Sequence, residues 1–210
     1  MKQRLLILFT LVGFVLFSAS AITEQQKKDV ISKINNASTS IQSMSASFTQ
    51  TKYLSMLSDK MVSSGKVYYS KSDKLRWEYT SPYQYLFIFN GSKVYVGNKS
   101  KKNVIDTNTN KVFKEIARIM MSTVTGTALS NTSDFSITLS ESSNQWVITL
   151  VPKKKELKSM FSKVILYFNK TSYIVSEINI YEKNGDRTNI KFSGLTTNKK
   201  IDATLFSIPK

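Results

Sequence analysis

Residues 65–97 read GKVYYSKSDKLRWEYTSPYQYLFIFNGSKVYVG, and the spacing of their apolar residues is typical of β-structure. Within it, Leu75, Trp77 and Tyr79 alternate with charged residues. Successive side chains of a β-strand point to opposite faces, so the alternation predicts a strand with one apolar face. We therefore expect a sheet with an aromatic surface in this part of the chain.

The next run, residues 85–89 (YLFIF), is apolar at every position. Such a run predicts a strand that is buried on both faces. Asn90-Gly91 follows and favours a tight hairpin turn, because both residues adopt positive φ at low cost. The second face of the sheet must therefore be covered, either by a helix of the same chain or by a ligand. The pattern leaves open which alternate side chains of the run face that cover.

β-Structure dominates the rest of the pattern. We expect strands near residues 46–54, 61–70, 74–80, 84–90, 93–97, 102–106, 134–140, 145–151, 162–169, 173–183, 187–194 and 204–208. Their close, even spacing with turn signals between them predicts a large antiparallel sheet, curled or closed into a barrel.

Two segments have helical periodicity. Thr23 and Gln26 resemble a capping box, and apolar residues recur at helical spacing over residues 30–44. Residues 112–124 (VFKEIARIMMSTV) carry a second apolar stripe, which Gly126 ends. Because this second helix lies between two groups of strands, it is a candidate cover for the concave face of the sheet.

The first 21 residues are expected to be a cleaved signal peptide. Lys2 and Arg4 form a basic start, residues 5–17 an apolar segment, and Ala19-Ser20-Ala21 a small-residue cleavage site. Cleavage would leave residues 22–210 as a single exported domain. The chain has no cysteine, so its stability must come from packing and sheet hydrogen bonds rather than from disulfides.

The charge balance is strongly basic. The full chain carries a net charge of +16, and removal of Lys2 and Arg4 with the leader leaves +14. A charge of this size favours acidic partners or anionic membrane surfaces. Export argues against nucleic acid as the partner. Most lysine clusters, including residues 153–155, are interpreted as solvated loops.

Missing residue types exclude most catalytic chemistry. The absence of His and Cys removes the Ser-His-Asp and Cys-His nucleophile systems and nearly all zinc sites. With 7 glycines, the chain also lacks a glycine-rich phosphate loop. We therefore expect no catalytic residues, no metal, no cofactor and no enzymatic activity.

The order of these features resembles the periplasmic outer-membrane lipoprotein carrier family, LolA. The resemblance covers nearly all of the chain after the leader. It rests on the exported leader, the first and mid-chain helices, the long hairpins and these motifs: Ala46-x-Phe48-x-Gln50, Gly65-x-Val67-Tyr68, Leu75-Arg76-Trp77-x-Tyr79-x-x-Pro82, Asn90-Gly91 before Val94-Tyr95, and Ile201-Asp202-Ala203-x-Leu205-Phe206-x-Ile208-Pro209.

The resemblance implies a mainly β fold with α-helices: an unclosed antiparallel β-barrel, or half-barrel, whose concave hydrophobic face is covered by helices. We expect five aromatic residues to line an acyl-chain cavity: Trp77, Tyr79, Phe87, Phe89 and Tyr95. The helix of residues 112–124 would be the lid, with three residues on its apolar side: Ile116, Ile119 and Met120. Each acyl CH₂ removed from water there would contribute about 0.8 kcal/mol.

One position departs from the family pattern. The family typically has an arginine, usually followed by proline, after the Gly-x-Val-Tyr strand, and this arginine latches the lid by hydrogen bonds. Here the position falls on Lys71, followed by Ser72. Lysine offers three donors on a flexible stem and lacks the planar guanidinium fork. We therefore expect Lys71 to be the lid latch, bonding carbonyls of residues 118–121 more loosely than arginine would.

The resemblance also implies partners and location. The protein would be a monomeric periplasmic carrier of acylated lipoproteins, which it receives from an inner-membrane ABC-type lipoprotein-release complex. It would deliver them to an outer-membrane acceptor whose identity the sequence does not give. Two alternatives stay open: an exported binder of another amphiphilic lipid, and a regulatory module that senses lipoproteins without transporting them.

Overall fold

The computed structural model describes residues 22–57, 59–71, 73–98, 100–130 and 133–209. The expected signal peptide, residues 1–21, lies outside the described residues. Within the described part, no helix is both long enough and apolar enough to cross a membrane.

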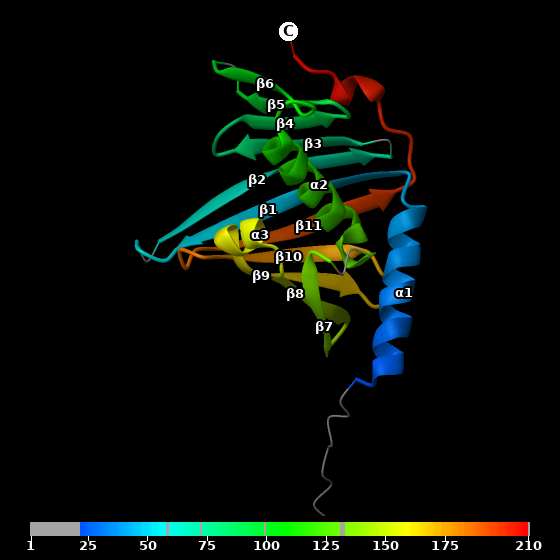
Figure 1. The fold of residues 1–210 in the computed structure, drawn as a ribbon. Helices are drawn as coiled ribbons and strands as arrows, with labels where there is room; N and C mark the ends of the chain where they lie inside the picture. The colour runs from blue at the N-terminus through cyan, green and yellow to red at the C-terminus, as the bar shows by residue number, and fades with distance from the viewer. Residues whose placement is uncertain (1–21, 58, 72, 99, 131–132, 210) are drawn as a thin grey trace, which may run out of the picture.

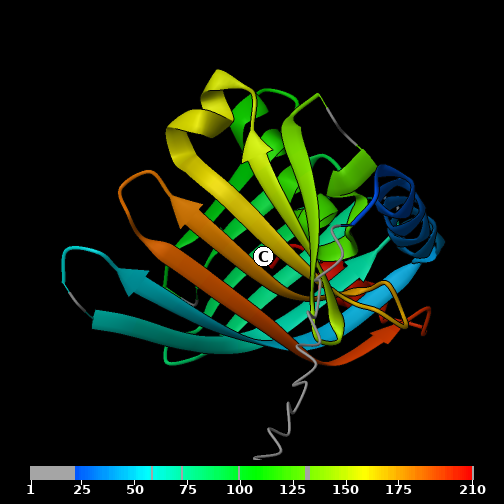
Figure 2. The same ribbon diagram turned by 90° about the horizontal axis from the view of Figure 1, so that it is seen from below.

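The strands form a single antiparallel sheet that curls around itself (Figures 1 and 2). Its 11 strands are β1 (Ser43–Leu54), β2 (Asp59–Ser70), β3 (Lys74–Ser81), β4 (Tyr85–Asn90), β5 (Lys93–Gly97), β6 (Lys102–Asp106), β7 (Phe135–Ser142), β8 (Gln145–Pro152), β9 (Phe161–Asn169), β10 (Val175–Glu182) and β11 (Arg187–Thr197). The spatial order is β6-β5-β4-β3-β2-β1-β11-β10-β9-β8-β7. The two meandering halves therefore join where β1 pairs with β11.

The sheet does not close into a barrel, because β6 and β7 are its two edges among the described strands. The chain passes from one edge to the other through α2 (Lys111–Thr125), which crosses the concave face (Figure 1). A short 3₁₀ turn, η1 (Thr127–Ser130), completes this crossing. The expected half-barrel with a helix over its concave face is confirmed.

The first helix, α1 (Glu24–Ser40), begins with the expected capping box. Thr23 Oγ1 accepts from the Gln26 N–H at 3.2 Å, and Gln26 Oε1 accepts from the Thr23 N–H at 2.9 Å. Val30 and Ile34 are buried on its inner side. Met44, which was expected to continue the helical stripe, belongs to β1 instead, where it is buried on the concave face.

The mid-chain helix α2 has clear ends. Asn110 Oδ1 accepts from the Phe113 N–H at 3.3 Å at its start, and Gly126 ends it with φ 86°. A Cβ at Gly126 would lie 2.7 Å from Ser38 Oγ and 2.9 Å from the Phe168 ring. Glycine is therefore required here both for the left-handed backbone and for the close approach to α1 and β9.

Two elements differ from the sequence prediction. Residues 204–208 were expected as a strand, but residues Ala203–Phe206 form a 3₁₀ turn, η2, in which Asp202 Oδ1 accepts from the Thr204 N–H at 2.9 Å. A six-residue helix, α3 (Lys155–Met160), replaces an expected loop, because Leu157 is buried against the core. One turn and a half of helix is too short to show a periodic pattern.

Strand β4 is buried on both faces, as its uniform apolar sequence predicts. Phe87 and Phe89 belong to the concave core cluster, whereas Ile88 points to the convex side and is completely buried. Residues 203–206 cover this convex side (Figure 1), held by Arg76 Nη1, which donates to Leu205 O at 3.0 Å, and by Asn90 Nδ2, which donates to Phe206 O at 3.1 Å. The chain itself therefore covers both faces of β4.

Candidate functional site

An aromatic cluster occupies the concave face where β1, β2 and β3 lie side by side. The Phe48 ring lies 4.5 Å from the Trp77 ring and 5.2 Å from the Tyr79 ring, the latter edge-on. A Cβ at Gly65 would lie 2.7 Å from the Phe48 ring, so glycine on β2 leaves the room that this ring occupies. The cluster is therefore built from motif residues of three neighbouring strands.

Tyr79 marks the boundary of this apolar surface. Its hydroxyl donates to Gln50 Oε1 at 2.9 Å, so the one polar atom of the ring has a partner on the same face. Burial raises the pKa of the Tyr79 phenol further above its ordinary value of 10, at which the side chain is already neutral at physiological pH. The aromatic cluster consequently presents no ionised group to the concave face.

A cavity of about 50 Å³ lies lower on the same face, between the helices and the second half of the sheet. Its lining comes from α2, α3 and strands β7 to β10: Ile119, Ser122, Thr123, Phe135, Leu150, Leu157, Phe161, Val164 and Ile180. A site for one water molecule needs about 10–15 Å³ of such space, so this cavity has room for only a few waters and is far too small for an acyl chain. The structure thus describes a closed arrangement.

The polar residues of this lining are already satisfied within α2. Ser122 Oγ and Thr123 Oγ1 both donate to Ile119 O, at 3.0 and 2.7 Å. Their hydroxyls therefore need no partner from the cavity, and the surface offered to a ligand is apolar. Such a lining favours a hydrocarbon chain over a polar ligand, because polar groups entering it would lose hydrogen bonds to water.

One buried carboxylate ties the lid to the sheet. Asp134, at the start of β7, is completely buried, and its Oδ2 accepts from Arg118 Nη2 of α2 at 2.9 Å. Its Oδ1 lies 2.6 Å from Lys154 Nζ, directly before α3. Both helices that roof the cavity are thus linked to the same carboxylate, at the edge of the sheet where β7 begins.

The ionisation of Asp134 depends on these two partners. Burial alone would raise its pKa, but hydrogen bonds and positive charge from Lys154 and Arg118 outweigh burial and lower the pKa. The group is therefore a carboxylate at neutral pH. Lys154 had been interpreted as part of a solvated loop, and this interpretation is wrong for it, because its ammonium group pairs with a buried acid.

Four of the five aromatic residues that were expected to line the cavity lie on the same face of the sheet. Trp77, Tyr79, Phe87 and Phe89 share the concave face, where all four pack in or against the same core. Tyr95 was predicted to join them, but this is wrong. It pairs with Ile88 and therefore points to the convex side, where it is 2% exposed. None of the five lines the 50 Å³ cavity, which lies farther along the same face.

The three predicted lid residues have different outcomes. Ile119 lines the cavity, and Met120 is half-buried against the core. The side chain of Ile116 is not among those that the structure describes. Among the side chains of α2 that the structure describes, Ala117 and Val124 are the most deeply buried, at 0% and 1% exposure.

Lys71 lies in the turn between β2 and β3 with its side chain exposed. Its backbone N–H donates to Gln42 O at 2.8 Å, next to the end of α1. Among the described residues, no hydrogen bond joins its ammonium group to α2. The latch at Lys71 stays a prediction, whereas Arg118 of α2 is paired with Asp134 at 2.9 Å.

Sequence reasoning missed the cavity residues of the second half of the sheet, among them Leu150, Phe161, Val164 and Ile180. The alternation of apolar residues in the strands after residue 145 could have predicted this lining. Ile148 pairs with Leu166 and Leu150 pairs with Val164, so all four side chains point to the same face. Asp134 offered no such signal, because its partners are 16 and 20 residues away in the chain.

The fold and site together define a lidded half-barrel: an open antiparallel sheet with an apolar concave face, roofed by helix α2. The family model described as "Outer membrane lipoprotein carrier protein LolA" matches residues 39–209, and the chain belongs to this family. Proteins of the LolA family are carriers rather than enzymes.

Relatives and solved structures agree with this assignment. The outer-membrane lipoprotein carrier protein of Legionella pneumophila (strain Corby) is 25% identical to this chain, and the match covers 93% of this chain and 91% of that protein. The outer-membrane lipoprotein carrier protein of Pseudomonas syringae pv. syringae is 24% identical, and the match covers 100% of this chain and 97% of that protein. The fold is similar to an uncharacterised conserved protein of Thermus thermophilus (TM-score 0.55, 10% identity, 89% of this chain and 96% of that one). It is also similar to the Mycobacterium tuberculosis lipoprotein LppX (TM-score 0.50, 13% identity, 86% and 100%).

Proposed function

We propose that this protein is a periplasmic carrier that binds the acyl chains of lipoproteins on the concave face of its sheet. It receives them from an inner-membrane ABC-type release complex and hands them to an outer-membrane acceptor. Residues 1–21 direct export, and residues 22–210 form the carrier domain. Membership of the LolA family and relatives named as lipoprotein carriers support the choice of cargo.

One observation carries the proposal: a continuous apolar layer lies between the concave face and α2 in a sheet that stays open at one side. The layer runs from the aromatic cluster around Phe48 and Trp77 to the cavity below Ile119. An acyl chain that replaces α2 on this surface gains about 0.8 kcal/mol for each CH₂ group buried. A long chain can therefore offset the contacts that α2 gives up.

Loading requires the lid to move. A volume of about 50 Å³ accommodates only part of an acyl chain, so α2, α3 or both must shift to admit one. Lid packing thus opposes binding, which keeps the affinity moderate and lets the cargo leave. Directionality comes from the donor complex and from an acceptor that binds the cargo more tightly.

The test is release of a lipoprotein from inner-membrane spheroplasts into solution. Val164→Glu places a carboxylate on the floor of the cavity, where it cannot be desolvated cheaply, and should abolish release. Lys163→Gln is the matched control, because it changes the net charge by the same amount at the neighbouring residue on the opposite face of β9. Equal release by both variants would place the acyl chains on another surface.

The two alternatives predict different results. Mass spectrometry of lipid that co-purifies with the protein should find acylated protein, and free glycolipid in its place would favour a binder of another amphiphile. Depletion of the protein should make lipoproteins accumulate in the inner membrane. A normal distribution of lipoproteins after depletion would favour a sensory module.

A further inference from the structure

The hairpin between β1 and β2 ends in an unusually apolar tip. Met56 and Leu57 in the turn are 93% and 68% exposed, and Met61 and Val62 on the returning strand are each 50% exposed. Figures 1 and 2 both show this hairpin projecting beyond the turn between β10 and β11. Large side chains gathered at one projecting point mark a surface that meets an apolar partner.

The base of the tip is joined to the neighbouring turn. Ser55 N–H donates to Asp186 Oδ1 at 3.0 Å, and Ser55 Oγ donates to Asn184 O at 3.0 Å, which join it to the β10–β11 turn. The Arg187 guanidinium lies 4.1 Å from the Tyr53 ring centre, packing the two hairpins together. These contacts anchor the base from which the exposed apolar residues extend.

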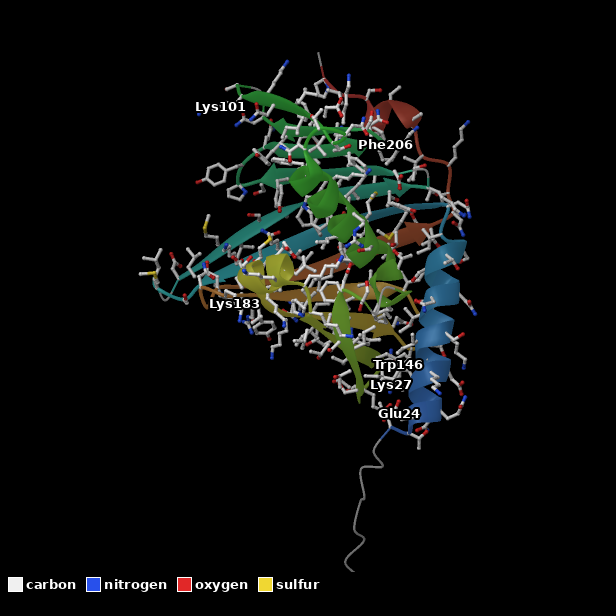
Figure 3. All side chains as sticks on the ribbon, viewed as in Figure 1. Glu24, Lys27, Lys101, Trp146, Lys183 and Phe206 are labelled. Carbon is white, nitrogen blue, oxygen red and sulfur yellow. The ribbon has the colours of Figure 1, made fainter. Side chains whose placement is uncertain are left out.

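The β10–β11 turn also contacts α3. The Lys183 N–H donates to Met160 O at 3.1 Å, and Met160 is 46% exposed. Figures 1 and 2 show the β1–β2 tip, the β10–β11 turn and α3 along one rim of the sheet, and Figure 3 labels Lys183 on it. We call these three elements the hairpin rim. Leu157 and Phe161, at α3, line the cavity, so the hairpin rim borders the cavity.

The charges on the hairpin rim are mainly basic. Four exposed lysines lie on it: Lys60, Lys155, Lys158 and Lys183. The exposed acids are Asp59 and Glu156, while Glu182 and Asp186 lie 3.2 and 3.5 Å from the Lys52 ammonium. Apolar side chains that project between ammonium groups match a bilayer surface, because the chains enter the acyl boundary while lysines remain at the headgroups.

We propose that the hairpin rim is a docking surface for an anionic lipid bilayer. Each lysine near such a surface adds attraction, and the large positive charge of the whole chain acts in the same direction. A second copy of the chain is a poor occupant, because the same charge makes the copies repel each other. This inference deepens the proposed function, since docking brings the cavity beside the bilayer that donates or receives acylated cargo, but its test needs no cargo.

The experiment is co-sedimentation of the signal-free protein with vesicles of equal parts phosphatidylethanolamine and phosphatidylglycerol. We expect the double variant Met56→Ser, Leu57→Ser to lower the partition coefficient by about tenfold or more, since two exposed apolar side chains no longer enter the bilayer. The control is Val104→Ser with Val151→Ser, which removes exposed apolar side chains on β6 and β8. It should bind as the parent does.

Two further arms separate the chemical contributions. Lys60→Gln with Lys183→Gln should weaken binding to anionic vesicles, and added salt should weaken binding of the parent protein. Vesicles of phosphatidylcholine alone should bind the parent more weakly than anionic ones. Unchanged binding by the Met56 and Leu57 variant, or equal binding to both kinds of vesicle, would overturn the proposal.

Binding only to membranes that contain inner-membrane proteins would also overturn it, in favour of a protein partner. Because these vesicles hold no lipoprotein, failure here leaves the release assay with Val164→Glu unaffected. Conversely, loss of the carrier function would leave vesicle binding intact.

Discussion

Replacement of Asp134 by asparagine should open the lid. The variant keeps the shape of the side chain but removes the negative charge that Arg118 and Lys154 share, at 2.9 and 2.6 Å. Breaking a fully buried ion pair by removing one partner costs about 3–5 kcal/mol. Here the Arg118 and Lys154 side chains are 39% and 50% exposed, so water can solvate them after the change.

The variant loses two charge-assisted hydrogen bonds, and because Arg118 and Lys154 are partly exposed, their loss costs less than that of a buried pair. We therefore expect the free energy that holds the lid closed to fall by about 2 kcal/mol. At 1.36 kcal/mol per factor of ten, such a loss raises the population of the open lid about thirty-fold. The assay is fluorescence of anilinonaphthalene sulfonate, a dye that binds exposed apolar surface. Thermal unfolding of the same samples reports whether the rest of the fold is kept.

Two variants make this result interpretable. Arg118→Gln removes only the contact from α2 and should produce part of the increase in dye binding. Glu141→Gln changes the charge by the same amount as Asp134→Asn but removes an exposed pair with Lys170, so dye binding should stay at the parent level. If Asp134→Asn lowers the unfolding temperature while Arg118→Gln leaves dye binding unchanged, the carboxylate stabilises the fold and does not latch the lid.

The remaining predictions concern pH, the expected latch and the aromatic cluster. Because the pKa of Asp134 is lowered on folding, its contribution is fully present above about pH 4 and is lost as the pH falls through the folded pKa. Dye binding by the parent should therefore rise in acid, whereas Asp134→Asn should lack this component of the titration. If Lys71 latches the lid, Lys71→Leu should raise dye binding, and unchanged dye binding by this variant would count against the latch. Phe89→Glu buries a carboxylate in the core and should abolish lipoprotein release, and retained release by a folded variant would exclude this part of the concave face.

Much of the sheet was predictable because its signals are local. Alternation around Trp77 and the uniform run over residues 85–89 identified β3 and β4, and Asn90-Gly91 identified the turn to β5. The same turn also determines to which face Tyr95 points, and this was overlooked in the prediction. A two-residue turn pairs Asn90 with Lys93, which sets Tyr95 opposite Ile88 and not beside Phe87 or Phe89.

Contacts between distant segments were not predictable in this way. The C-terminal segment alternates as a strand would, yet it lies across the convex face, because Asp202 caps a 3₁₀ turn and Arg76 and Asn90 bind its carbonyls. The cover required for the second face of β4 was expected to be a helix or a ligand. Residues 203–206 supply it as a short turn, and Phe206 is 2% exposed there.

The cover on the convex face also determines when each part of the fold can be completed during synthesis. Strands β1 to β6 are made first, but β1 gains its second neighbour only when β11 exists, and Ile88 is covered only once residues 203–206 have been made. Pairings between residues so far apart form slowly. A growing chain therefore keeps an open sheet edge and an uncovered apolar face until synthesis has almost finished. The sheet is therefore incomplete at its centre until the C-terminal residues have been added.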